Sequence, residues 1–169
     1  MQVSNHFRLR RQVAVALLAT ASALGFMPHA AWAYDESSTS ALNVDAKGVA
    51  IKGYDVVAYF TAATPTLGKP EFTSTHNGAS YLFSSAANRD AFRQNPARYA
   101  PQFGGFCAMG VVLNKKLDGD PAAWRVVDDK LYLNVNKDVQ KKWLEDVPGN
   151  LVKASKFWPA IKDKTPKSL

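Results

Sequence analysis

The sequence is poor in the side chains that form disulfides and metal sites. Among its 169 residues it has one cysteine, Cys107, with three histidines and three methionines. A single cysteine cannot form a disulfide within its own chain, so side-chain packing must stabilise the fold. A structural zinc site usually takes four Cys or His ligands, and a blue-copper site takes two His and one Cys. Both kinds of site are therefore difficult for one copy of this chain to assemble.

The first 33 residues have the pattern of a secretory signal peptide. Three arginines within residues 8–11 precede an uncharged, mostly apolar stretch of 14 residues, 13–26. A proline and then a small-x-small sequence at residues 31–33 follow, which is the pattern that signal peptidase cleaves. The apolar stretch is shorter than the roughly 20 residues of a membrane-spanning helix. We therefore expect cleavage near Ala33, no membrane span in the mature chain, and a periplasmic or secreted location.

Cleavage at this point would change which side chains are available for chemistry. The remaining 136 residues hold 18 basic and 14 acidic residues, a mild positive charge that does not indicate a nucleic-acid partner. His76, Cys107 and Met109 would be the only residues of their three types. Because thiolate, thioether and imidazole suit Cu(I), these three residues are the candidate metal ligands and Cu(I) is the candidate ion.

The clearest local structural signal is the Asn-Gly pair at residues 77–78. This dipeptide supplies the positive φ angles of a two-residue type I′ turn, which predicts a β-hairpin. The predicted register pairs His76 with Ala79. Four residues further from the turn, it pairs Phe72 with Phe83, which would place two aromatic rings on one face.

A second hairpin and several short helices are expected further along the chain. The turn signal at residues 128–130 lies between two β-prone segments, 124–127 and 131–135. A helix should follow the capping residues 84–85, and residues 53–60 read as extended chain. Two more helices are expected, over residues 137–145 and 151–157, the first ending at Pro148-Gly149 and the second at Trp158-Pro159.

These elements predict one small α+β domain in which two β-hairpins pack with several short helices. The Ser-rich residues 34–47 read as a flexible leader, because they carry few large apolar side chains. The domain itself is expected over residues 48–160. A loose basic tail is expected over residues 161–169.

Several short segments, taken in their order along the chain, form a recognisable series. They are GYDVVAYF at 53–60, GASYLFSS at 78–85, NRDAF at 88–92, FGGFCA at 103–108 and KLYLN at 130–134. The series resembles the YHS domain family, and most closely its exported, single-domain bacterial branch. The resemblance covers residues 48–160 and implies a YHS-like α+β fold.

The chain departs from the metal-binding members of that family at the position that matters most. Those members carry a Phe-Cys-Ser-x-x-Cys type of motif after the hairpin, whereas this chain has Ser84 and Asn88 where the two cysteines would fall. Neither side chain is a good ligand for a soft metal. The resemblance therefore implies the fold, and the family's paired-cysteine site is not carried over.

The surroundings of Cys107 allow two interpretations. It lies in an apolar stretch, where a free cysteine is commonly a buried packing residue. It also follows Gly104-Gly105, and a helix starting there would offer backbone N–H groups that lower the pKa of the thiol. Met109 would share a face with Cys107 in a strand but not in a helix.

Three functions remain open from the sequence. The first is an exported, non-enzymatic YHS-domain protein that binds a soft metal such as copper through Cys107. The second is a metal-free module that binds a small molecule or a protein, with Cys107 as a buried structural residue and Tyr54, Tyr59, Tyr81 and Tyr99 lining a pocket near it. The third is a thiol-dependent enzyme using Cys107 and His76. No sequence signature supports the third, so a non-enzymatic role is expected.

Overall fold

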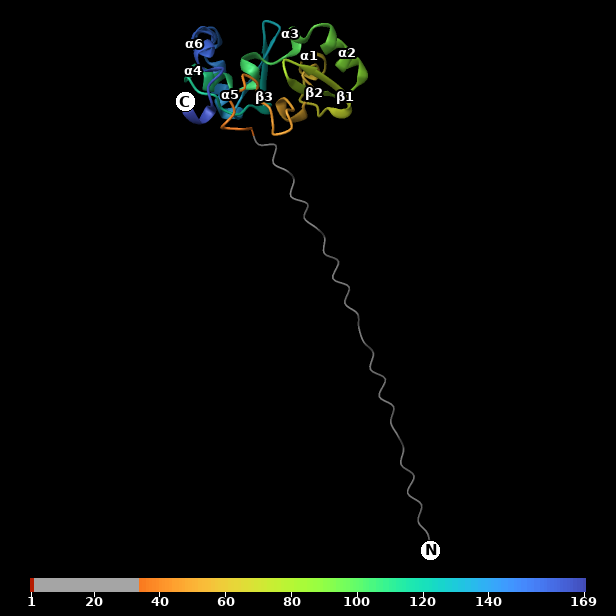
Figure 1. The fold of residues 1–169 in the computed structure, drawn as a ribbon. Coiled ribbons are helices and arrows are strands. Elements are labelled where there is room, and N and C mark those ends of the chain that lie inside the picture. The colour runs from red at the N-terminus through yellow and green to blue at the C-terminus, as the bar shows by residue number, and fades with distance from the viewer. Residues whose placement is uncertain (2–33) are drawn as a thin grey trace. The chain divides into compact units, whose positions relative to one another are not determined.

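Helices and strands are mixed along the chain in the computed structural model, which describes Met1 and residues 34–169 (Figure 1). The signal peptide expected over residues 1–33 lies, apart from Met1, outside the described residues. The described elements are η1 (Ile51–Gly53), α1 (Ala58–Thr61), β1 (Lys69–His76), β2 (Ala79–Phe83), α2 (Ala86–Gln94), α3 (Pro96–Tyr99), η2 (Gln102–Gly105), α4 (Ala108–Val112), β3 (Asp120–Val127), β4 (Lys130–Asn134), α5 (Lys137–Leu144), α6 (Val147–Ile161) and η3 (Pro166–Ser168). The expected α+β class is confirmed.

The first hairpin forms around the expected turn. Strands β1 and β2 pair antiparallel, with His76 opposite Ala79. Asn77 and Gly78 have φ angles of 49° and 82°, both in the left-handed region that a type I′ turn requires. The local sequence therefore determines this turn and the first pair of residues beside it.

The register of the same hairpin differs from the prediction further from the turn. The expected pair of Phe72 and Phe83 is wrong, because Lys69 lies opposite Phe83. The register shifts between Lys69 and Thr73, a stretch that contains Pro70. Proline has no N–H to give to the strand ladder, and the Thr73 hydroxyl donates to the Pro70 carbonyl oxygen at 2.6 Å instead. An irregularity at the proline thus re-aligns the start of β1.

The second hairpin also forms where the sequence predicts it. Strands β3 and β4 pair antiparallel, with Trp124 opposite Leu133. Asp128 and Asp129 make the turn with φ angles of 48° and 57°, a conformation that Asp tolerates better than most residues. Strand β3 begins at Asp120, four residues before the predicted start, and its register also shifts before Trp124.

Side-chain hydrogen bonds cap the starts of two of the predicted helices, α2 and α5. The Ser85 hydroxyl accepts the backbone N–H of Asn88 at 3.2 Å and caps α2, as expected. The Asn136 side chain accepts the N–H of Val139 at 2.9 Å and caps α5, which matches the predicted helix. In both cases the capping residue directly precedes the helix in the sequence.

Two helical predictions differ from the structure. The stretch predicted as extended, residues 53–60, contains the start of α1, so that prediction is wrong in its second half. Helix α6 is one continuous helix in which Pro148 lies in the first turn and Pro159 near the end. A proline in the first turn loses no helical hydrogen bond, and the side chain of Asp146 accepts the N–H of Gly149 at 2.9 Å. Pro148 and Gly149 therefore lie in the first turn of α6, whereas α5 already ends at Leu144.

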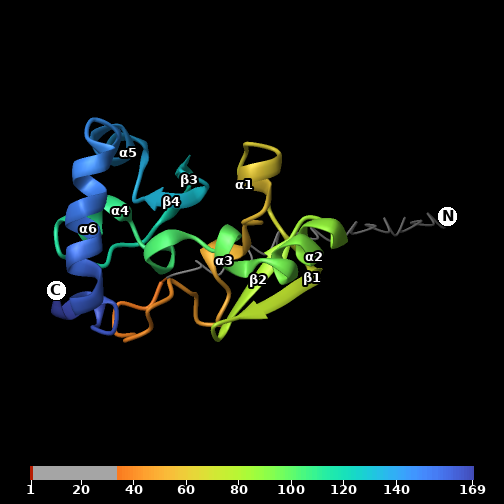
Figure 2. The same cartoon turned by 90° about the horizontal axis from the view of Figure 1, so that it is seen from above.

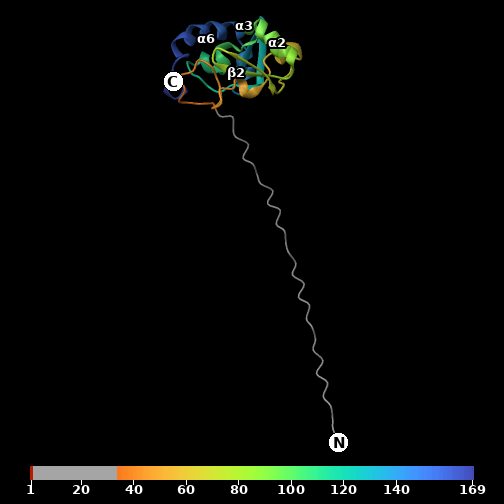
Figure 3. The ribbon, with the colours of Figure 1, turned by 45° about the vertical axis from the view of Figure 1, so that its right-hand side comes forward.

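The two hairpins share one hydrophobic core. Phe83 of β2 and Phe92 of α2 pack in the same buried cluster as Leu131 and Leu133 of β4. A second cluster surrounds Trp143, and a third joins α4 to α6. In Figures 2 and 3, β2 and α2 lie toward one end of the domain and α6 with the C-terminus toward the other.

Residues 34–169 are a self-contained folding unit. Contacts group residues 32–169 into one compact unit, and the buried clusters and hydrogen bonds described above lie within the described part of it. A segment with its own core of this kind can fold alone. Within residues 34–169, no helix combines the length and apolar character that spanning a bilayer requires.

Lys116 connects both ends of this unit, where the sequence predicts a flexible leader and a loose tail. Its side chain is buried, and Nζ donates to the carbonyl oxygens of Ser40 at 2.7 Å, Lys162 at 2.9 Å and Lys164 at 2.8 Å. The ammonium also lies 4.7 Å from the ring centroid of Phe106. All three N–H donors of this ammonium are thus satisfied by carbonyl groups that lie 46 to 76 residues away in the sequence. The same bonds hold residues of the leader and of the tail against the domain.

We expect Lys116→Met to lower the free energy of unfolding of residues 34–169 by about 2–4 kcal/mol, because three part-buried carbonyl groups lose a charged donor. Lys115→Met is the matched control, since the neighbouring Nζ donates only to the exposed Leu169 carbonyl oxygen at 2.9 Å. The control should cost no more than about 0.5 kcal/mol. Urea denaturation of both variants measures the difference, and equal losses would contradict the role given to Lys116.

Candidate functional site

Cys107 lies between a tight turn and a short helix. The turn contains Phe103, Gly104 and Gly105, with φ angles of 52°, 62° and 85°. At Gly104 a side chain would collide with the Ala41 carbonyl group, so the close approach of the leader requires glycine there. Cys107 follows as the N-cap of α4, with its backbone N–H bonded to the Leu117 carbonyl oxygen at 2.9 Å.

The Cys107 thiol is enclosed and hydrogen-bonded. Its side chain has no exposed surface, and Sγ accepts the backbone N–H of Gly110 at 3.3 Å. The thiol also lies 3.7 Å from Asn134 Oδ1, to which it can donate. Burial raises the pKa of Cys107, and the nearby N–H groups of Gly110, Val135 and Met109 oppose this shift without reversing it. The expectation that the glycine turn and helix start would lower this pKa is therefore wrong.

Met109 has the same polar neighbour as Cys107 but a different packing environment. Its backbone N–H donates to Asn134 Oδ1 at 3.2 Å. Its side chain is partly buried against the cluster of Ala108, Tyr132 and Trp143. Because α4 is helical here, residues two positions apart point in different directions. Asn134 thus links the two residues through hydrogen bonds, while the Met109 side chain serves the packing of α4 on α5.

His76 makes its contacts in another part of the domain. It is the last residue of β1, is half-buried, and meets the ring of Phe92 edge-on with centroids 5.8 Å apart. Phe92 in turn packs against Tyr81 and Phe83. The ring contact of His76 is therefore with α2, whereas the thiol of Cys107 contacts α4 and β4.

The described residues contain no group of three or more His, Cys, Asp or Glu side chains that could hold a metal ion. Cys107, Met109 and His76 accordingly stay a predicted ligand set.

The structure reveals one polar centre that the sequence reasoning missed. Asp55 is fully buried, and its Oδ2 accepts the backbone N–H of Ser84 at 2.9 Å, the Ser84 hydroxyl at 2.7 Å and the Asn88 amide at 2.6 Å. Ser84 and Asn88 are the two positions at which the family resemblance would place metal-binding cysteines. In this chain both side chains are instead donors to a carboxylate.

The second oxygen of Asp55 binds the start of α1. Oδ1 accepts the backbone N–H groups of Val57 at 2.9 Å and Ala58 at 3.3 Å. Two backbone groups with no helical partner are thereby satisfied, which explains why α1 forms in a stretch with extended propensity. A fully buried Asp is rare unless it is paired, so an acid inside the apolar run of residues 53–60 was the signal that could have revealed this centre.

The aromatic residues considered for a pocket are largely part of the core. Tyr59 is buried, its hydroxyl donates to the Pro121 carbonyl oxygen at 3.0 Å, and its ring meets Trp124 with centroids 5.0 Å apart. Burial raises the pKa of Tyr81 to about 12. Tyr59 and Tyr81 therefore support packing between the hairpins rather than line an open pocket.

A small cleft lies where the leader meets the domain. Tyr34, Asn43, Lys52 and Asp118 are among its lining residues. Lys52 Nζ pairs with Asp118 Oδ2 at 2.8 Å, and the Asn43 amide donates to Asp118 Oδ1 at 2.9 Å. The cleft has room for roughly a single water molecule, far less than the several hundred Å³ of a metabolite pocket. Its polar groups bind one another and hold the leader in place.

Removing the Asp55 carboxylate should be among the most damaging single changes in the domain. Asp55→Ala leaves buried N–H and O–H donors without an acceptor, and we expect the free energy of unfolding to fall by about 3–5 kcal/mol. Asp45→Ala is the matched control, because Asp45 also accepts two backbone N–H groups, from Lys47 and Val49, but at a partly exposed turn. That change should cost about 0.5–2 kcal/mol in the same urea titration. A loss at Asp55 no larger than at Asp45 would refute this ranking.

The chain matches no protein-family model, no curated protein and no solved structure. The resemblance to the YHS family therefore remains a hypothesis based on the ordered series of short segments.

Proposed function

We propose that the chain is an exported, non-enzymatic interaction module with a YHS-like fold, and that Cys107 is a structural residue in it. One observation carries the proposal: the Cys107 sulfur is fully buried and already serves as the N-cap acceptor of α4. A sulfur in that role stabilises a helix start and is not available to a substrate. The proposed export rests on the signal pattern in residues 1–33.

The environment of the thiol argues against a cysteine nucleophile. Thiol catalysis uses the thiolate, which needs a lowered pKa and a base within hydrogen-bonding reach. Burial raises the pKa of Cys107, and the thiol contacts the Asn134 amide oxygen rather than a histidine. The ring contact of His76 is with Phe92. These facts favour a non-catalytic role.

The same environment weighs against copper binding through Cys107. A metal ion needs a deprotonated sulfur, and the raised pKa and full burial of Cys107 oppose both deprotonation and entry of the ion. The paired positions at Ser84 and Asn88 are committed to Asp55. Copper binding is the competing function, and the shared contact of Cys107 and Met109 with Asn134 is the observation in its favour.

The polar surroundings of the leader favour a surface-acting module over a small-molecule carrier. The cleft beside Asn43 and Asp118 holds roughly a single water molecule, and its polar groups are paired with one another. Two of the tyrosines that could line a pocket, Tyr59 and Tyr81, are buried in the core. We therefore place the functional contacts on the outer surface of the domain.

The thiol provides the direct test. In folded residues 34–169, Cys107 should react with iodoacetamide at neutral pH more slowly than free cysteine, because burial keeps the reagent from the sulfur and the raised pKa lowers the thiolate fraction. Full reactivity should return in urea. The protein should also take no stoichiometric Cu(I) from a competing chelator.

Two substitutions separate the structural role from copper binding. Cys107→Ala should cost about 1–2 kcal/mol of unfolding free energy through loss of the helix cap, without changing copper uptake. Met109→Leu keeps the packing volume and removes the thioether, so it should change stability by less than about 1.5 kcal/mol. Tight Cu(I) uptake that both substitutions abolish would overturn the proposal and establish the copper site.

A further inference from the structure

The net positive charge of the described domain is confined to its C-terminal part. Residues 34–146 contain 13 basic and 13 acidic residues, so their formal charges cancel. Residues 147–169 contain five lysines and one aspartate. The part of the chain that forms α6 and the segment after it therefore carries the whole excess of four positive charges.

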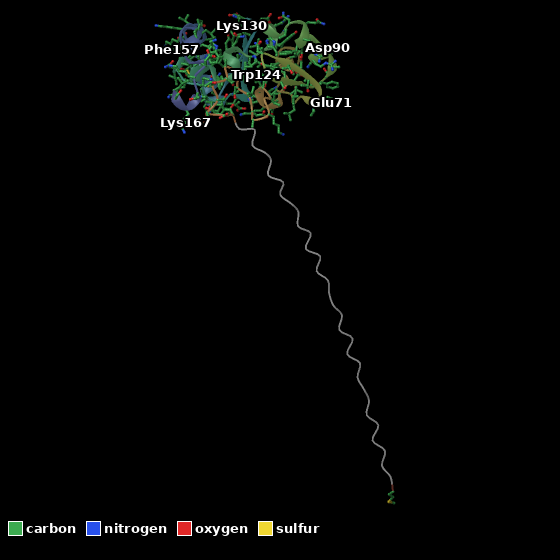
Figure 4. The ribbon with its side chains drawn as sticks, in the orientation of Figure 1. Glu71, Asp90, Trp124, Lys130, Phe157 and Lys167 are labelled. Atoms are coloured by element: carbon green, nitrogen blue, oxygen red, sulfur yellow. The ribbon has the colours of Figure 1, made fainter. Side chains whose placement is uncertain are left out.

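Helix α6 presents part of this charge on its outer face. Asn150, Ala154 and Ile161 are buried on its inner face, at a spacing that follows the helical repeat. On the outer face, Lys153 and Lys156 are exposed, and Val152 beside them is 73% exposed. In Figure 4, Phe157 of α6 lies at the end of the domain opposite Glu71 and Asp90.

Not every lysine of this segment has a free charge. Lys162 forms an ion pair with Asp163 at 3.5 Å. Lys153, Lys156 and Lys164 are exposed and form no ion pair within residues 34–169. These three lysines, together with Val152, are here termed the α6 surface.

The position of the α6 surface is held by the fold. The carbonyl oxygens of Lys162 and Lys164 accept hydrogen bonds from the buried Lys116 ammonium. Ala154 and Ile161 pack with Val111 of α4 in a buried cluster. The lysines therefore extend from a fixed backbone, and bringing their charges together on a partner requires no folding of the segment.

We propose that the α6 surface docks the domain on an anionic phospholipid membrane. Lysines beside an anionic bilayer each strengthen binding by about fivefold through attraction to the lipid phosphates. The exposed Val152 lies beside Lys153 and one helical turn from Lys156, where it can enter the boundary between headgroups and acyl chains. This inference rests on the proposed function and names the partner of the surface-acting module.

The chemistry of the surface favours lipid over the other anionic partners. Specific protein interfaces are enriched in arginine and depleted in lysine, and arginine binds carboxylates in a bidentate manner. The basic residues of the segment 147–169 are all lysines, and the four arginines after residue 33 all lie before residue 126. Nucleic-acid binding would make no use of the exposed apolar Val152. A lysine-rich surface with an exposed apolar side chain beside it fits a lipid headgroup layer best.

Sedimentation with vesicles tests the proposal. Residues 34–169 should bind phosphatidylcholine vesicles containing about 30% phosphatidylglycerol and should leave vesicles of phosphatidylcholine alone unbound. Lys153→Gln with Lys156→Gln should weaken partitioning about 25-fold. Raising the ionic strength to about 1 M, where the Debye length is about 3 Å, should also release the protein. Val152→Ser should weaken binding by about threefold through loss of apolar contact.

A charge-matched control separates the surface from net charge. Lys69→Gln with Lys130→Gln removes the same two charges from exposed positions on β1 and β4, and binding should fall less than about threefold. Equal weakening by both pairs, equal binding to neutral vesicles, or binding to heparin or an acidic peptide without binding to vesicles would overturn the proposal. The slow iodoacetamide reaction of Cys107 should persist in the variant Lys153→Gln with Lys156→Gln. A failure of membrane binding can therefore be distinguished from a failure of the proposed function.

Discussion

Hydrogen bonds to the buried Asp55 carboxylate organise the part of the domain that contains the first hairpin. Its two oxygens receive N–H and O–H groups from α1, from the end of β2 and from α2, so one buried acid joins three elements. A buried charge without a cation is stable only when hydrogen bonds satisfy it. The first hairpin, α1 and α2 are therefore arranged around a set of donors, and Ser84 and Asn88 are two of them.

Lys116 does the same for the two ends of residues 34–169. Its ammonium is buried against Phe106 and bound to carbonyl oxygens from both terminal segments. A chain with one cysteine has no disulfide to hold its ends, and a fully satisfied cation can take that role at the cost of desolvation. Both charged residues are thus structural, and the charges proposed to meet a partner lie elsewhere, on the α6 surface.

Burial changes the role that can be assigned to Cys107. In the sequence it is the most reactive side chain, and it follows two glycines after which a helix could begin. In the fold its sulfur caps α4 and contacts Asn134, and burial raises the pKa of its thiol. The candidate site identified from composition is accordingly a point of structural support. The proposed partner surface consists instead of the lysines and the exposed valine of the α6 surface, which composition indicates only as a mild net charge.

Features that depend on near neighbours could be predicted from the sequence: the α+β class, both hairpin turns, the capped start of α2 and the start of α5. Those features follow from residues within four positions of one another, such as Asn77 with Gly78 or Ser85 with Asn88. Four features could be seen only in the tertiary structure. They are the register of the first hairpin beyond its turn, the helical form of α1, the raised pKa of Cys107 and the packing of His76 on Phe92 rather than near Cys107. Each of these features depends on groups that lie far apart in the sequence, such as Ser84 and Asp55, and that the fold brings into contact. Each also depends on how deeply those groups are buried.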